Sequence, residues 1–193
     1  MDDQQFRQIL DFLGLSWEGY RRVRKGVKKR IARHMQEVGC RSMEEYLHPL
    51  EKDPEVRKQV EQLMAVSISR FFRDRYLWYI LENHGLPIVH AGNPENIKVW
   101  SAGCACGEET YSFKIIWDVW QNRLARTPEL ELWATDLNPE FLEKARSGVY
   151  SLSSLKELPA EFRSKYFTPI PGNLFAVSDR IKEGILWRTH NIV

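Results

Sequence analysis

The feature that most restricts the fold of this chain is a short apolar strand that enters a turn of small residues and continues into a helix. It occupies residues 100–112, with the sequence WSAGCACGEETYS. Small residues let the backbone approach a ligand closely, as in nucleotide-binding α/β proteins. Because Glu108 and Glu109 open the helix, a phosphate would be repelled there. A positively charged ligand, or one that presents sugar hydroxyls, fits better.

A second apolar strand follows and ends at Asp136. Glu108 and Asp136 then fall at the carboxyl ends of neighbouring strands, where open α/β sheets bind ligands. An acidic residue after the second strand is suited to grip ribose hydroxyls. S-adenosylmethionine joins an adenosine to a sulfonium cation and carries no phosphate. The two carboxylates therefore predict S-adenosylmethionine as the cofactor.

Four motifs occur in one order: residues 68–73 (ISRFFR), 100–112, 135–136 and 145–150 (ARSGVY). Their order and spacing resemble those of the CheR-type chemotaxis methyltransferases, from about residue 5 to the last residue. That family uses S-adenosylmethionine to methylate glutamate side chains of methyl-accepting chemotaxis receptors, which yields glutamate methyl esters and S-adenosylhomocysteine. The resemblance therefore implies a protein-glutamate O-methyltransferase of chemotaxis signal transduction.

The resemblance also implies an α/β chain in two parts. Residues 1–66 would form an all-α helical bundle for receptor recognition. Residues 67–193 would form a partial Rossmann-like methyltransferase domain with a small antiparallel β insert. The family continues beyond the position of Val193, so we expect a C-terminally truncated chain with an incomplete catalytic domain. The sheet edge exposed in this way predicts homodimerisation or strand exchange.

Several site residues follow from the resemblance. Arg73 matches the arginine of a threonine-x-phenylalanine-phenylalanine-arginine motif and would hold the methionine carboxylate or orient the incoming glutamate, as the catalytic residue. Serines stand at 67 and 69, where the family commonly has asparagine and threonine. Asn191 and Ile192 match a pair that frames the adenine. The predicted cofactor contacts are Ser67, Ser69, Arg73, Glu108, Asp136, Asn191 and Ile192.

The segment 21–33 contains eight basic residues and no acidic one. Apolar residues at helical spacing predict a helix with one buried face and cations on the others. The family links this lobe to recognition of the cytoplasmic receptor helices. The predicted receptor contacts are Arg21, Arg24, Lys25, Lys28 and Lys29. The alternative is a non-catalytic module that uses residues 20–34 to bind an acidic protein helix or nucleic acid.

Apolar periodicity predicts helices across residues 6–66, one of them starting at Asp53-Pro54, and a further helix over 73–83 that ends near Gly85. We expect a parallel βαβ unit with strands at 98–102 and 130–135 and a helix over 108–125. A helix from Asn138-Pro139 to Gly148 follows. Strands at 174–177 and 185–190 are expected to belong to the antiparallel insert.

Other observations narrow the class of protein. No apolar run approaches the roughly 20 residues of a membrane span, and the start MDDQQ is not a signal peptide, so we expect a cytoplasmic protein. The three cysteines, Cys40, Cys104 and Cys106, are expected to be free thiols. Because the Cys-x-Cys pair lacks the spacing and partners of a metal site, we expect no metal.

Overall fold

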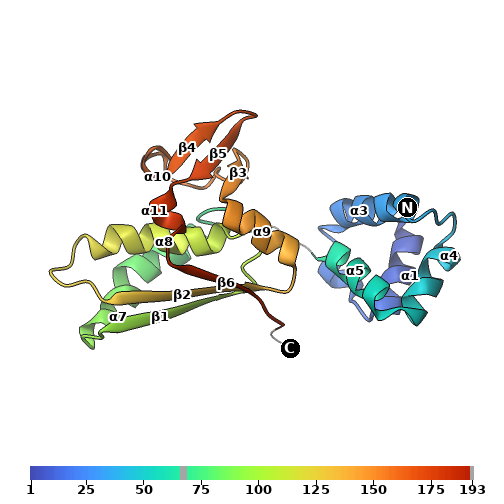
Figure 1. The fold of residues 1–193 in the computed structure, drawn as a ribbon, viewed down its shortest axis with the longest axis horizontal. Helices are drawn as coiled ribbons and strands as arrows, with labels where there is room; N and C mark the ends of the chain where they lie inside the picture. Colours follow the sequence, from blue (N-terminus) through green and yellow to red (C-terminus); the bar gives the residue numbers. More distant parts are fainter. Residues whose placement is uncertain (66–68, 192–193) are drawn as a thin grey trace. The chain divides into compact units, whose positions relative to one another are not determined.

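A computed structural model describes residues 1–65 and 69–191. The chain divides into two compact units, Met1–Val66 and Ser67–Val193. Figure 1 shows helices alone in the first unit, and helices with two sheets in the second. The second unit confirms the α/β class. In the described parts of the chain, no helix is long and apolar enough to cross a membrane.

The first unit is a bundle whose helices begin at well-formed caps. Asp2 and Gln5 form a capping box at the start of α1, and Asp53 accepts N–H bonds before a proline at the start of α5. The predicted start at Asp53-Pro54 is therefore confirmed. The helices are α1 (Asp3–Leu13), α2 (Trp17–Tyr20), α3 (Arg24–Glu37), α4 (Met43–Lys52) and α5 (Pro54–Met64). Their buried faces meet in one core that includes Phe6, Ile9, Ile31, Tyr46 and Val60.

A parallel sheet organises the second unit. Its strands are β1 (Asn96–Ala102), β2 (Glu129–Asp136) and β6 (Ile185–Thr189), in the order β1-β2-β6. The prediction that residues 185–190 belong to the antiparallel insert is wrong. The short helix α11 (Asp179–Lys182) and Gly184, with φ of 75°, redirect the chain, so that β6 runs parallel to β2.

The antiparallel insert contains β3 (Val149–Ser151), β4 (Phe167–Ile170) and β5 (Leu174–Val177), in the order β3-β5-β4. Residues 174–177 are a strand of this sheet, as predicted. The helix α10 (Ala160–Tyr166) leads directly into β4. Gly172 and Asn173, which both have positive φ, form the turn between β4 and β5.

Two helix boundaries differ from the prediction. The helix expected to end near Gly85 continues as α6 (Arg75–Ile80), a π-helical turn η1 (Leu81–Gly85) and α7 (Leu86–Ala91). Pro87 directly follows the π-helical turn, in which the Leu86 N–H donates to the Leu81 carbonyl, and the missing N–H of Pro87 falls where this bonding pattern changes to that of α7. Helix α8 (Glu108–Gln121) stops short of residue 125, and the Asn122 side chain donates to the Asp118 carbonyl at that end.

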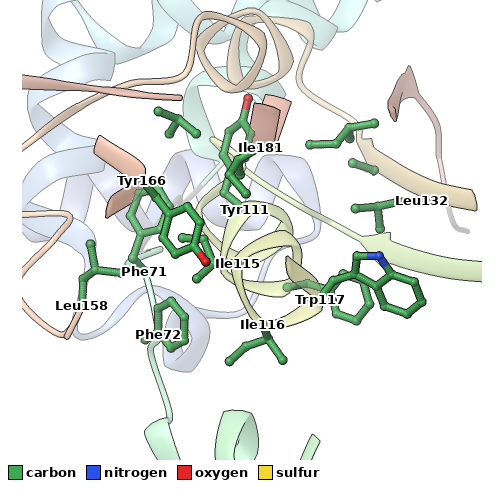
Figure 2. Packing of buried hydrophobic residues seen from close by; sticks show 14 of the residues in the cluster. Phe71, Phe72, Tyr111, Ile115, Ile116, Trp117, Leu132, Leu158, Tyr166 and Ile181 are labelled. Atoms are coloured by element: carbon green, nitrogen blue, oxygen red, sulfur yellow. The ribbon is translucent and has the colours of Figure 1, made fainter. Parts of the chain in front are cut away.

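Helix α8 is the centre of the second unit's core. Figure 2 shows Tyr111, Ile115 and Ile116 of α8 packed among side chains from distant parts of the chain. Phe71 and Leu132 are among those side chains, and both are fully buried. Helix α9 (Pro139–Ser147) follows β2 and ends at Gly148 in the left-handed conformation, as predicted. The core therefore fixes both ends of the loop between β1 and α8.

Candidate functional site

The loop between β1 and α8 alternates residues with positive φ. Gly103 has φ of 70°, Ala105 of 50° and Gly107 of 88°. The Cys104 N–H donates to the Thr135 carbonyl at 2.9 Å, and the Gly107 N–H donates to the Cys104 carbonyl at 2.9 Å. The first bond holds the loop against the carboxyl end of β2, and the second closes a turn within the loop.

The two glycines that flank the loop have different surroundings. A Cβ atom at Gly107 would lie 2.9 Å from the Ala145 Cβ and 3.0 Å from the Trp187 ring, so only glycine fits there. A Cβ at Gly103 would meet no heavy atom of the described chain within 4 Å. Gly107 therefore packs the loop onto α9 and β6, whereas Gly103 borders open space in which a ligand could approach the backbone.

Asp136 connects β2 to this loop. Its Oδ2 accepts the Ala105 N–H at 2.8 Å, and its Oδ1 accepts the Asn138 N–H at 2.9 Å. An ionised carboxylate has about four acceptor sites, so these two bonds leave capacity for hydroxyl donors. The residue predicted as a ribose contact therefore also shapes the loop, which the sequence did not reveal.

Glu108 is the first residue of α8 and is 4% exposed. Within the described chain its Oε2 is buried and has no hydrogen-bond partner. Burial raises the pKa of Glu108, although its own backbone N–H and the hydroxyls of Ser69 and Ser154 act in the opposite direction. A buried carboxylate oxygen without a donor is costly, and a cationic or N–H-bearing ligand would satisfy it.

The segment before α6 presents Arg73. The Phe71 N–H donates to the Ser154 carbonyl at 3.1 Å, and the Phe72 N–H donates to Ser112 Oγ at 2.9 Å. The Trp78 indole donates to the Arg73 carbonyl at 2.7 Å. Phe71 and Phe72 are buried, so the backbone is fixed while the Arg73 side chain is 58% exposed.

The Arg73 guanidinium also has a neighbour on its own segment. Its Nε lies 4.0 Å from Asp74 Oδ2, and the Asp74 side chain is 75% exposed. An exposed ion pair at that distance contributes little to stability, so it competes weakly with a ligand carboxylate.

The chain after β6 stays beside the same edge of the sheet. The His190 N–H donates to the Asp136 carbonyl at 3.1 Å, and Asn191 follows directly. Ser67 and Ile192, two of the predicted cofactor contacts, lie outside the described residues. The structure thus brings Glu108, Asp136 and the position of Asn191 to the carboxyl edge of the parallel sheet.

Two buried tyrosines support the loop and were not predicted to do so. The Tyr150 hydroxyl donates to the Cys106 carbonyl at 2.6 Å, and the Tyr111 hydroxyl donates to the Ala145 carbonyl at 2.8 Å. Both residues belong to motifs used in the sequence comparison. A buried tyrosine requires a partner for its hydroxyl, but the sequence does not say which carbonyl supplies it.

The cysteines of the loop are packing residues. Cys104 and Cys106 are buried, and all three cysteines of the chain are free thiols, as predicted. Burial, followed by the nearby Asp136 carboxylate, raises the pKa of Cys104 to about 12. Its thiol is therefore protonated at neutral pH and is a poor nucleophile.

Part of the basic segment is used inside the helical unit. Lys28 and Arg24 contact Asp3 of α1 at 2.7 and 3.3 Å. Arg30 donates to the carbonyls of Leu63 and Ala65 at the end of α5. These three cations hold α3 against its neighbours, so the segment is less available to a partner than its composition indicates.

The remaining basic residues of the segment are exposed, on α3 and in the turn that precedes it. Arg21 is 3.8 Å from Glu18, and both side chains are largely exposed. Arg22, Lys25, Lys29 and Arg33 are exposed. No ion pair within the described chain involves these four. Lys25, Lys29 and Arg33 are four residues apart on α3, which places them on one side of the helix, and Arg22 lies in the turn just before it.

Comparison with known proteins gives a consistent result. Residues 67–193 match the model of the CheR methyltransferase SAM-binding domain. A chemotaxis protein methyltransferase of Listeria innocua is 28% identical over 181 residues, which cover 94% of this chain and 66% of that protein. Chemotaxis protein methyltransferase Cher2 of Pseudomonas putida is 28% identical over 86% of this chain and 63% of its own length. A chemotaxis protein methyltransferase of Vibrio parahaemolyticus is 31% identical over 74% of this chain and 52% of its own length. The chain thus spans less than two thirds of each of these relatives.

Proposed function

Because the chain belongs to the CheR methyltransferase family, we propose that it transfers the methyl group of S-adenosylmethionine to glutamate side chains of chemotaxis receptors in the cytoplasm. The products would be a glutamate methyl ester and S-adenosylhomocysteine. The buried, unpartnered oxygen of Glu108 beside the 103–107 loop is the observation that carries the proposal. This oxygen is placed to accept a hydrogen bond from an N–H group of the cofactor.

The residues at the sheet edge fit the cofactor. Glu108 offers a buried acceptor for the ammonium group of the methionine moiety. Asp136 has acceptor capacity for ribose hydroxyls, and Gly103 leaves the backbone accessible. The two carboxylates suit a ligand that carries positive charge and no phosphate.

S-adenosylmethionine supplies an electrophilic methyl group on its sulfonium. The accepting glutamate has an unperturbed pKa of about 4.3 and is ionised at neutral pH, so the protein needs no strong base. The task of the chain is to align and desolvate the reacting groups. In this proposal Arg73, with its fixed backbone and exposed guanidinium, orients a carboxylate by two-point hydrogen bonding.

The surface of α3 supports receptor recognition. We assign the contact to the stripe of exposed cations Lys25, Lys29 and Arg33 on α3, with Arg22 in the preceding turn, because Arg24 and Lys28 already neutralise Asp3. Carboxylates on one face of a partner helix have the same three- and four-residue spacing. The same stripe would serve the alternative function, a non-catalytic module that binds an acidic helix or nucleic acid.

Calorimetric titration with S-adenosylhomocysteine tests the cofactor site. We expect the wild-type chain to bind S-adenosylhomocysteine. Glu108→Gln should bind it about tenfold more weakly, since a hydrogen bond to a charged group is lost. Asp136→Ala should also lose binding. Glu140→Gln, an exposed position on α9, is the matched control and should bind as wild type. Equal affinity in all four proteins would refute the assignment.

Transfer itself needs a second assay. The chain is incubated with a receptor cytoplasmic fragment and methyl-labelled S-adenosylmethionine, and the label is then released with base. Release as methanol would identify a glutamate methyl ester. Cofactor binding with no label on the receptor, together with selective receptor binding, would favour the binding module. Salt-sensitive binding to duplex DNA would favour its nucleic-acid form.

A further inference from the structure

A second polar site lies at the opposite end of α8 from Glu108. A cavity of about 270 Å³ is lined by Lys114, Trp117, Asp118, Gln121, Asn122, Arg180 and Ile181. Asp118 is ten residues beyond Glu108, or about 15 Å along the helix, so the two sites are separate. The proposed methyl transfer assigns no role to this cavity.

The floor of the cavity is a buried carboxylate with several donors. Asp118 is 4% exposed and accepts the Tyr166 hydroxyl at 2.7 Å. Arg180 and Lys165 also pair with it. Burial raises the pKa of Asp118, but the Tyr166 hydroxyl and the Arg180 guanidinium outweigh that effect and hold the pKa below its ordinary value. Asp118 is therefore ionised and fully compensated.

The cations at this site exceed what Asp118 requires. Arg180 and Lys165 already pair with the carboxylate, and the Arg180 side chain is 61% exposed, so its further N–H groups are accessible. Lys114 is half-buried one turn before Asp118, and its Nζ donates to the Glu183 carbonyl at 2.9 Å. Within the described chain, Lys114 forms no ion pair with a carboxylate. Burial lowers the pKa of Lys114, although the nearby Asp118 and Glu183 carboxylates act in the opposite direction.

We propose that this cavity is a binding site for an oxyanion, a phosphate or a carboxylate group, held between Lys114 and Arg180. The Lys114 ammonium has three N–H groups and gives one of them to the Glu183 carbonyl, so an incoming anion can accept the others. The Gln121 and Asn122 amides at the rim each donate one N–H to Asp118, and their second N–H adds a neutral donor. The volume accommodates a phosphate with a small substituent. An occupant would bridge α8 to α11, which leads into β6.

Nuclear magnetic resonance of the chain tests the site with defined probes. Inorganic phosphate, acetate and chloride are titrated separately at matched ionic strength, while the side-chain amide signals of Gln121 and Asn122 are followed. We expect saturable shifts of these signals with phosphate or acetate that exceed those with chloride. A larger response to phosphate would indicate a phosphate-bearing ligand, and a larger response to acetate an acidic side chain.

Variants separate binding from general charge effects. Lys114→Met keeps the aliphatic stem and should weaken the preferred anion about tenfold, the effect of one charge-assisted hydrogen bond. Lys156→Met, an exposed position elsewhere in the unit, should leave the titration unchanged. If Lys114→Met does not fold, Gln121→Met serves in its place and should weaken binding less. The proposal would be overturned if phosphate and acetate shift the amide signals no more than chloride does, or if neither cavity variant changes the shifts. The ion pairs around Asp118 would then have only a structural role.

Discussion

Glu108 illustrates how a binding residue can burden the ligand-free protein. Its unpartnered oxygen costs folding free energy that a ligand would recover. We therefore expect Glu108→Gln to raise the free energy of unfolding at neutral pH by about 1–3 kcal/mol while it weakens cofactor binding. Urea denaturation beside Glu140→Gln measures the first effect. A variant less stable than wild type would show that the bonds of Glu108 with Ser69 and Ser154 outweigh the cost of its unpartnered oxygen.

The pH dependence of that effect has a definite sign. Burial raises the pKa of Glu108 above its unperturbed value of 4.5, so the folded state keeps the proton to higher pH than the unfolded state. The stability that protonated Glu108 contributes to the folded state is fully present below pH 4.5 and is lost as the pH rises through the folded-state pKa. The advantage of Glu108→Gln over wild type should therefore shrink as the pH falls toward 4.5.

The two loop glycines make a matched pair for substitution. Gly107→Ala combines a positive φ with a contact of 2.9 Å, so we expect a loss of several kcal/mol of stability. Gly103→Ala meets only the backbone penalty of about 1–2 kcal/mol and should fold, yet bind S-adenosylhomocysteine less tightly. Denaturation and calorimetry separate these outcomes. Unimpaired binding in Gly103→Ala would mean that no ligand approaches this backbone.

At the scale of elements, α8 positions the segment that carries Arg73. Ser112 of α8 accepts the Phe72 N–H and donates to the Glu108 carbonyl. Ser112→Ala leaves that buried N–H unpaired and should cost about 1–3 kcal/mol of stability and also lower the rate of methyl transfer. Ser147→Ala, which removes an exposed hydroxyl on α9, is the control. Equal rates in both variants would show that this bond does not position Arg73.

Helix α3 is the element on which the receptor contact depends. Lys25→Glu with Lys29→Glu should weaken binding to an acidic receptor helix about tenfold at low salt, and the difference should narrow as salt screens the charges. Lys52→Glu with Lys58→Glu, also exposed in the helical unit, is the matched control. Fluorescence anisotropy at two salt concentrations measures the binding of both double variants to the receptor helix. A similar loss of affinity in the control variant would show that net charge alone causes the effect.

The sequence predicted the elements better than their connections. Asn138-Pro139 and Gly148 mark α9 correctly because caps depend on neighbouring residues. The assignment of 185–190 to the insert failed because strand pairing is a long-range property: β6 pairs with β2, about 50 residues earlier. For the same reason the sequence did not predict that Asp136 accepts the Ala105 N–H or that Lys28 pairs with Asp3, because each pair is distant in sequence.

At the scale of the whole molecule, we expect association through the outer edge of β1. No described residue pairs with that edge, and an apolar cavity of about 230 Å³ lies beside it. Antiparallel pairing of two copies about Val99 would place Lys98 of one copy against Trp100 of the other, a favourable cation–aromatic pair. This geometry supports the expectation of a homodimer of the 193-residue chain.

Light scattering coupled to gel filtration tests that association. We expect the mass to rise with concentration for wild type and to stay monomeric for Trp100→Lys, which sets like charges together across the edge. Leu137→Lys alters an exposed leucine beyond the end of β2 and should associate as wild type. A wild-type monomer at high concentration would contradict the prediction.

The strand order β1-β2-β6 also has a consequence for synthesis on the ribosome. The helical unit emerges first, whereas β2 can pair on only one side until β6 leaves the ribosome. At about 5–20 residues per second, that delay lasts roughly 2–10 s. During this interval the free edge of β2 is exposed, so the nascent sheet is open to pairing with other chains.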